Sequence, residues 1–245
     1  MEELLWIFLL PIVALVVVLC AALDAMIEPR KRKLWGENEE HLTSVDDVVS
    51  RAKTGDLILF QGTGISSWLI RFMSVCKVWS HVGVVVVHDG RKCITEAYNE
   101  VISEDLLRGG EHSGVQFVDL ETRLRTYPGG RLAYRPISGT VSTTSVDLVV
   151  EAYKRLDFSL VPRYNRNLWD FIEYGSRSDN DSNVHNGVKH YVCTAWVAQV
   201  LILLGVCSDR VAPGNYLLSD YGLTYRQMST LHEPFKFGDI SFIVC

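Results

Sequence analysis

The chain has 245 residues, of which 48% are hydrophobic, and its formal net charge is −5. Nucleic-acid-binding proteins usually carry a basic excess on one face, so this acidic balance argues against a nucleic acid as partner. The six cysteines lie far apart and form no CxxC pair, which argues against a zinc ribbon and against a dense disulfide scaffold.

The first predicted element is a membrane-spanning helix at residues 4–23. This run of 20 residues is apolar and uncharged. As a helix it would measure roughly 30 Å, the thickness of the hydrocarbon core of a bilayer. Basic residues follow at positions 30–33, and positive charges stay on the cytoplasmic side of a membrane. We therefore expect a single-pass membrane protein whose main domain is cytoplasmic and lies beside the lipid bilayer.

Two other interpretations of this segment remain open. The first is a cleaved signal peptide, although Glu2 and Glu3 stand where such peptides carry positive charge, and the apolar run is longer than usual. The second is a bacterial lipoprotein with Cys20 as the lipidated residue, although the bulky Leu19 stands where that signal has a small residue.

Residues 24–41 are polar and charged and are interpreted as a linker, and residues 42–245 are interpreted as one domain. Helical spacing of apolar residues predicts the helices of this domain, and short β-branched runs between turn residues predict its strands. The sequence therefore predicts an α+β fold in which helices pack on a mostly antiparallel sheet. In chain order, we expect a helix at 45–52, a strand at 56–60, a helix at 66–75, strands at 81–87, 91–97, 115–119 and 131–135, a helix at 146–156, a polar loop at 176–187 and a helix at 192–204.

Three of these segments carry side chains that suit covalent catalysis. Cys193 stands at the expected start of a helix, where amide groups favour a thiolate, the nucleophilic form of cysteine. His81 opens a strand, so a rigid element would hold it as a base. Glu96, on the next strand, would hold the imidazole in one tautomer. Taken singly, each also has a purely structural interpretation: a buried cysteine, a histidine at a strand edge and a surface carboxylate.

The turn between the two strands predicts how the last two residues are related. Asp89-Gly90 is a strong signal for a two-residue hairpin loop. With that loop, Gly83 faces Glu96, and His81 becomes the diagonal neighbour of Glu96 on one face, roughly 7–8 Å away at the backbone. A three-residue loop would place His81 and Glu96 on opposite faces.

The order of these motifs resembles the circularly permuted branch of the NlpC-type papain-like thiol hydrolases, which includes YiiX/YaeF-like proteins and is related to the lecithin-retinol acyltransferase group. The resemblance covers about residues 54 to 240. It is carried by GDLILF at 55–60, SHVGVV at 80–85, TEA at 95–97, GGRLAYRPI at 129–137 and YVCTAWVAQVL at 191–201.

This resemblance implies a permuted papain-like domain with Cys193 as nucleophile, His81 as base and Glu96 as the residue that orients the base. It also implies a role for Tyr164, which resembles a tyrosine near the family's active site and would donate a hydrogen bond to the developing oxyanion. A packing role for Tyr164 remains open.

The chain departs from the family pattern after the nucleophile. Thr194 replaces the usual serine, Ala195 replaces an acidic or polar residue, and the polar loop before the cysteine is an apparent insertion. These departures concern the substrate more than the mechanism.

The expected activity is that of a membrane-anchored cysteine hydrolase or acyltransferase that cleaves an amide or ester through a thioester. Peptide and acyl-lipid substrates both remain open, with the expected membrane location favouring lipid. The alternative is a catalytically silent lipid- or peptide-binding module, because a fold does not fix a function. We expect no cofactor. We also expect no metal, because His190 and Cys193 alone supply too few ligands for zinc.

Overall fold

The structure is a computed structural model that describes residues 42–64, 67, 70–71, 78–98, 100–111, 113–156, 184–185, 188–189, 193–222 and 230–244. These residues belong to one compact unit, Leu42–Cys245. The predicted linker at 24–41 and the sequence before it lie outside the described residues, as do most of the predicted helix at 66–75 and of the polar loop at 176–187.

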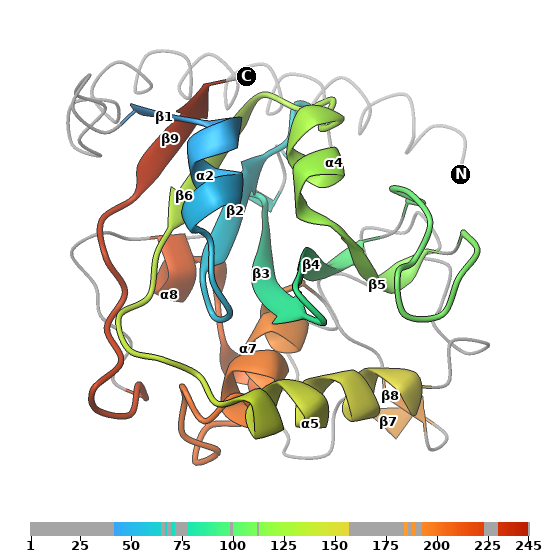
Figure 1. Ribbon diagram of the computed structural model, residues 1–245, viewed down its shortest axis with the longest axis vertical. Coiled ribbons are helices and arrows are strands. Elements are labelled where there is room, and N and C mark those ends of the chain that lie inside the picture. Colours follow the sequence, from blue (N-terminus) through green and yellow to red (C-terminus); the bar gives the residue numbers. More distant parts are fainter. Residues whose placement is uncertain are drawn as a thin grey trace, which may run out of the picture. The chain divides into compact units, whose positions relative to one another are not determined.

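A seven-stranded sheet runs through the centre of this unit (Figure 1). The strand order is β1-β9-β6-β2-β3-β4-β5, and every neighbouring pair is antiparallel except β1 with β9. A separate pair of two-residue strands, β7 and β8, completes the described strands. Their bounds are β1 Leu42–Ser44, β2 Leu57–Gln61, β3 His81–His88, β4 Arg91–Tyr98, β5 Gly114–Asp119, β6 Arg131–Arg135, β7 Val184–His185, β8 Val188–Lys189 and β9 Ser241–Val244.

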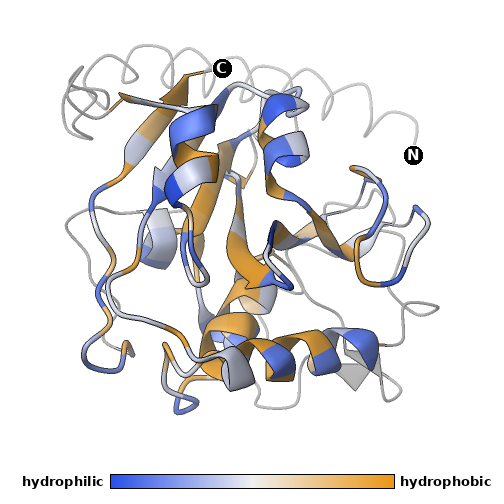
Figure 2. Cartoon of the chain, in the orientation of Figure 1, coloured by the Kyte–Doolittle hydropathy of each residue, from blue (hydrophilic) through white to orange (hydrophobic). Residues whose placement is uncertain are grey.

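The central strands are apolar because both of their faces are covered. All five residues of β2 and the first six of β3 are buried. A strand that alternated polar and apolar residues would leave polar groups without water on one of these faces. Figure 2 shows the resulting hydrophobic centre, to which β2, β3 and helix α7 contribute.

Helices α2 (Val45–Arg51) and α4 (Leu120–Arg125) cover one face of the sheet. Each begins at a side chain that accepts a hydrogen bond from the first turn: Ser44 Oγ from the Asp47 amide, and Asp119 Oδ1 from the Thr122 amide. Such caps satisfy amide groups that have no partner inside the helix. The apolar cluster beneath these helices includes Val45, Val48, Ala52, Ile58, Phe60, Val85, Ile94, Val118, Leu120, Leu124, Leu132, Tyr134 and Ile243.

Helices α5 (Thr143–Lys154) and α7 (Cys193–Leu203) lie on the other face, and Figure 1 shows them together, away from α2 and α4. Trp196 of α7 donates a hydrogen bond from Nε1 to Thr95 Oγ1 of β4 at 2.8 Å. Thr95 pairs with Phe117 on β5, whose ring contacts Tyr153 of α5. The helix α7 is followed by Gly205 at φ +72°, the left-handed conformation that commonly ends a helix. The remaining short helices are η3 (Pro213–Asn215) and α8 (Leu218–Gly222).

The sequence predicted the described elements of this unit closely. The strands expected at 56–60, 81–87, 91–97, 115–119 and 131–135 are β2 to β6, and the helices expected at 45–52, 146–156 and 192–204 are α2, α5 and α7. Several short elements were not predicted, because runs of two to six residues carry too little periodicity to stand out. They are the edge strand β1, its neighbour β9, the strands β7 and β8, and the helices α4, α8 and η3.

The predicted fold needs correction at its N-terminus. Among the residues that the structure describes, no helix has the length and apolar character required to cross a bilayer. The expected spanning helix at 4–23 lies outside those residues, so the transmembrane helix and the single-pass membrane placement have no support in the structure. A sufficiently long apolar run is a necessary condition for a membrane span, but it is not a sufficient one.

Candidate functional site

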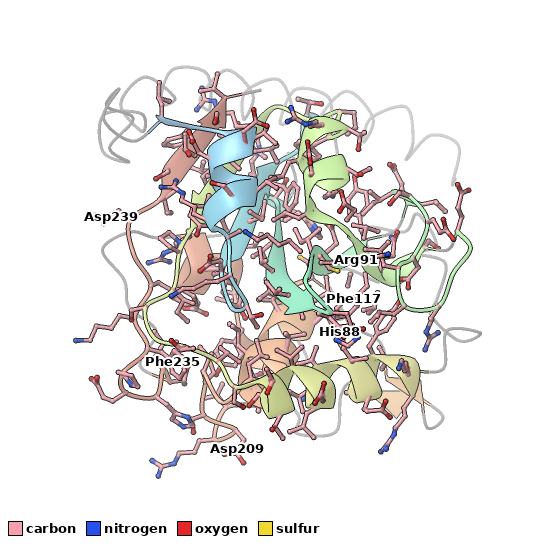
Figure 3. The ribbon with its side chains drawn as sticks, viewed as in Figure 1. His88, Arg91, Phe117, Asp209, Phe235 and Asp239 are labelled. Carbon is pink, nitrogen blue, oxygen red and sulfur yellow. The ribbon has the colours of Figure 1, made fainter. Side chains whose placement is uncertain are left out.

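The site is built on the hairpin of β3 and β4. Its loop is Asp89-Gly90, with φ angles of +50° and +75°, the pair of positive values that a type I′ turn needs. His88 therefore pairs with Arg91, and both lie at the tip of the hairpin in Figure 3. The predicted two-residue loop and its register are confirmed by this pairing.

This register brings His81 and Glu96 together on the face that α2 and α4 cover. His81 Nε2 and Glu96 Oε2 form a short hydrogen bond. The missing side chain of Gly83, which lies across from Glu96, makes room for this contact. A Cβ there would lie 2.7 Å from Ile94 Cδ1 and 3.3 Å from Glu96 Cβ.

Arg123 of α4 completes the surroundings of Glu96. Its Nε donates to Glu96 Oε1 at 2.6 Å, and its Nη2 donates to Glu96 Oε2 at 3.0 Å. This is a bidentate ion pair, the strongest geometry available between a guanidinium and a carboxylate. Both side chains are buried, Glu96 completely and Arg123 with 2% exposure.

The charge of Glu96 is set by these partners. Burial alone would raise the pKa of the carboxyl, because a charged group loses its hydration. The Arg123 guanidinium, followed by the hydrogen bond and charge of His81, more than offsets burial and lowers the pKa of Glu96 from 4.5 to about 2. Glu96 is therefore a carboxylate throughout the neutral range.

His81 is held between two aromatic rings. The ring centroid of Phe60 lies 5.2 Å from that of the imidazole, and the ring centroid of Tyr98 lies 5.1 Å away. Burial among these rings would lower the pKa of His81, but the charge and hydrogen bond of Cys193, and then those of Glu96, raise it to about 9. When the sulfur beside it is a thiolate, the imidazole therefore holds a second proton firmly, as a base that has taken the proton of the thiol must.

Cys193 reaches His81 from the other side of the sheet. It is the first residue of α7, it is half-buried and it forms no disulfide. Although α7 packs on the face opposite His81, its first residue lies near enough to the imidazole for the sulfur to raise the pKa of His81. Because Glu96 occupies Nε2 of His81, the nitrogen left to face the thiol is Nδ1.

Two hydrogen bonds hold the first turn of α7 in place. One is the bond from Trp196 to Thr95 on β4, already described. The other runs from Tyr221 Oη to the carbonyl oxygen of Thr194 at 3.0 Å. Tyr221 is buried, and burial together with nearby negative charges raises its pKa well above the ordinary value, so it stays a hydroxyl that can donate.

The structure thus brings together three of the four predicted site residues: Cys193, His81 and Glu96. The fourth, Tyr164, lies outside the described residues, as does His190. Within the described part of the chain, no three His, Cys, Asp or Glu side chains cluster closely enough to hold a metal ion.

Sequence reasoning missed Arg123. It lies 27 positions from Glu96, on a six-residue helix that has two charged side chains besides it. Nothing local separates Arg123 from Arg125, which is exposed and pairs with Glu121. The one available signal is the position of Leu120 and Leu124 on either side of it, which places residue 123 on the helix face that meets the sheet.

Comparisons with known proteins give little further information. A scan against protein-family models finds no match, and a search of curated proteins finds none. Among solved structures, the chain is weakly similar to the metalloprotein YiiX from Escherichia coli O157:H7, at 17% sequence identity and a TM-score of 0.40. That similarity covers 64% of this chain and 71% of YiiX. A likeness this distant is too weak to carry the role of any residue from one chain to the other.

Proposed function

We propose that the protein is a cysteine hydrolase or acyltransferase in which Cys193, His81 and Glu96 form the catalytic triad. The observation that carries this proposal is the hydrogen bond between His81 and the buried Glu96 carboxylate, with Cys193 near enough to raise the pKa of the imidazole. A nucleophile, a base within hydrogen-bonding reach and a third group that orients the base together make up the arrangement used in covalent acyl transfer. The resemblance of the motifs to permuted papain-like thiol hydrolases points the same way.

The first half of the reaction would form a thioester. His81 takes the proton of the Cys193 thiol, and the thiolate sulfur bonds to the carbonyl carbon of an amide or ester. Amide groups at the start of α7 face the oxyanion of the tetrahedral intermediate. The intermediate collapses, the C–N or C–O bond breaks, and the amine or alcohol leaves with the proton that His81 had taken.

The second half would release the acyl group. Water, or the amine or hydroxyl group of an acceptor, gives its proton to His81 and attacks the thioester carbonyl. The C–S bond breaks, the free acid or the transferred acyl product leaves, and the sulfur recovers its proton from the imidazolium. Throughout, Glu96 keeps Nε2 protonated, so that Nδ1 faces the sulfur. The same steps serve peptide and acyl-lipid substrates.

A simple ester tests this proposal without knowledge of the natural substrate. Incubation with a p-nitrophenyl acyl ester should give a burst of nitrophenolate and an acyl adduct on Cys193, released by hydroxylamine and located by mass spectrometry. Cys193→Ala should abolish the adduct, and His81→Gln should slow its formation by roughly 10²–10⁴-fold, the usual contribution of a positioned base.

The chain offers internal controls for this experiment. Cys93 and Cys207 are buried, and burial raises their pKa values to about 11 and about 12, so neither should be acylated. Acylation that persists at the wild-type rate in Cys193→Ala, or that maps to another residue, would show that the nucleophile is misassigned.

A further inference from the structure

Arg123 is a buried charged group beside the triad that the triad chemistry does not use. Its guanidinium lies over the rings of Phe60, Tyr98 and Tyr127, at 4.6, 5.0 and 5.2 Å from their centroids. These three rings, which we call the aromatic frame, leave the planar guanidinium few alternative positions. The planar fork of arginine matches a carboxylate in a way that the point charge of lysine does not.

The aromatic frame serves His81 and Arg123 at once. Phe60 and Tyr98 each contact the imidazole as well as the guanidinium. The aromatic frame therefore positions both groups that hydrogen-bond to Glu96, the His81 imidazole and the Arg123 guanidinium. The two Arg123 bonds occupy Oε1 and one side of Oε2, and the remaining side of Oε2 faces His81 Nε2.

We propose that Arg123 is a positioning residue that acts through Glu96: it locks the carboxylate in the one orientation that keeps Nε2 of His81 protonated and turns Nδ1 toward Cys193. This proposal rests on the proposed function, and it extends the triad to a line of four side chains. Without the guanidinium, burial of Glu96 would favour its neutral form. A protonated Glu96 accepts less strongly and can rotate, so His81 would lose its fixed tautomer.

The consequence is a shift in the pH dependence of the thiol. In an Arg123→Gln variant, Glu96 should take up a proton at a higher pH than in the wild type, and the acid limb of Cys193 reactivity should move up with it. Among the described residues, the other titratable groups that interact with this carboxylate are His81, Tyr98 and Tyr127, and these in turn interact with Cys193, Glu100 and Arg71.

The experiment measures the rate of Cys193 alkylation by iodoacetamide in the full chain, from about pH 4 to about pH 9, a range that brackets the ordinary values of Glu and His. Peptide mass spectrometry assigns the label to Cys193. The variants are Arg123→Gln, Arg123→Lys and, as a matched control on the same helix, Arg125→Gln. Arg125 is exposed and pairs with Glu121 and Asp46, away from Glu96.

We expect Arg123→Gln to lower the alkylation rate on the acid limb by about tenfold or more, which corresponds to one pKa unit. Arg123→Lys should recover the position of that limb, because it keeps the charge. The plateau rate of Arg123→Lys should stay a few-fold below that of the wild type, because lysine cannot make the bidentate contact with Glu96. Arg125→Gln should match the wild type. In a Glu96→Gln background, Arg123→Gln should have no further effect, because its route to His81 is gone.

Two results would overturn the proposal, and they can be told apart. If the pH profile of Arg123→Gln superimposed on that of the wild type, Arg123 would have no positioning role, while the proposed triad would still stand. A wild-type profile without a His81-dependent acid limb, seen by comparison with His81→Gln, would remove the triad itself. Should Arg123→Gln fail to fold, ¹⁵N chemical shifts of His81 in Arg123→Lys decide: an unchanged tautomer balance and plateau rate contradict positioning, and a changed balance supports it.

Discussion

Two carboxylates, Glu96 and Asp56, are completely buried at the sheet, and they are satisfied in different ways. Asp56, just before β2, accepts hydrogen bonds from neutral donors: the amides of Lys53 and Ile137 at 2.8 Å each, and Tyr134 Oη at 2.6 Å. Glu96, on β4, accepts from His81 and from the Arg123 guanidinium. One carboxylate thus has dipolar partners and the other has charged partners.

The difference shows in the direction of the two pKa values. Burial raises the pKa of Asp56 above 3.8, and its three neutral donors offset this only in part. At Glu96, by contrast, the Arg123 charge overcomes burial and the pKa falls to about 2. Neutral donors can therefore tie a buried carboxyl into the fold, but a nearby cation is what keeps it ionised. Asp56 has the pattern of a structural link, and Glu96 has that of a group whose charge is needed.

The largest expected effect comes from removing one partner of the buried Glu96–Arg123 ion pair. Glu96→Leu would leave the Arg123 guanidinium buried without its carboxylate, and we expect the free energy of unfolding to fall by about 3–5 kcal/mol. Urea unfolding followed by tryptophan fluorescence measures this change. The double variant Glu96→Leu, Arg123→Met should recover much of the loss, because it replaces both charges by apolar groups.

Glu121→Leu is the matched control on the surface of α4. Glu121 is 49% exposed and pairs with an equally exposed Arg125, so its removal should change the unfolding free energy far less. A Glu96→Leu variant no less stable than Glu121→Leu would mean that the buried ion pair does not hold Arg123 as the geometry indicates.

How much of this site the sequence predicts depends on the range of each interaction. The His81–Glu96 contact follows from a local rule, because the Asp89-Gly90 turn fixes the hairpin register. The meeting of Cys193 with the hairpin is a long-range event between the ends of two elements, and only the resemblance of the motifs suggested it. The Arg123 contact has neither a turn nor a motif behind it. The membrane-spanning helix was predicted from hydropathy alone. Hydropathy shows that an apolar segment is long enough to cross a bilayer, but not that it does so.

The pH dependence of stability sharpens the comparison at Glu96. Its folded pKa, about 2, lies below the unfolded value of 4.5, so Glu96 stabilises the fold above pH 4.5. That contribution is lost as the pH falls toward 2. The shift corresponds to about 3–4 kcal/mol at 1.4 kcal/mol per unit. We expect the difference in unfolding free energy between wild type and Glu96→Gln to shrink by about this amount over that interval, measured by urea unfolding at each pH. A difference that stays constant would show that Glu96 is not held as an anion.

Asp56→Asn should show a smaller effect with the opposite pH dependence. The amide cannot accept at both of its terminal atoms, so one of the Lys53, Tyr134 or Ile137 donors loses its partner, at about 1–3 kcal/mol. Because the folded pKa of Asp56 is raised, its contribution to stability is fully present below the unfolded value of 3.8 and declines as the pH rises through the folded pKa. The measured cost of Asp56→Asn should therefore be largest in acid and smaller at neutral pH, whereas the cost of Glu96→Gln grows with pH. If the cost of Asp56→Asn instead grew with pH, neutral donors would stabilise a buried anion as well as a guanidinium does. The burial of Arg123 beside Glu96 would then have to be explained by something other than keeping Glu96 ionised.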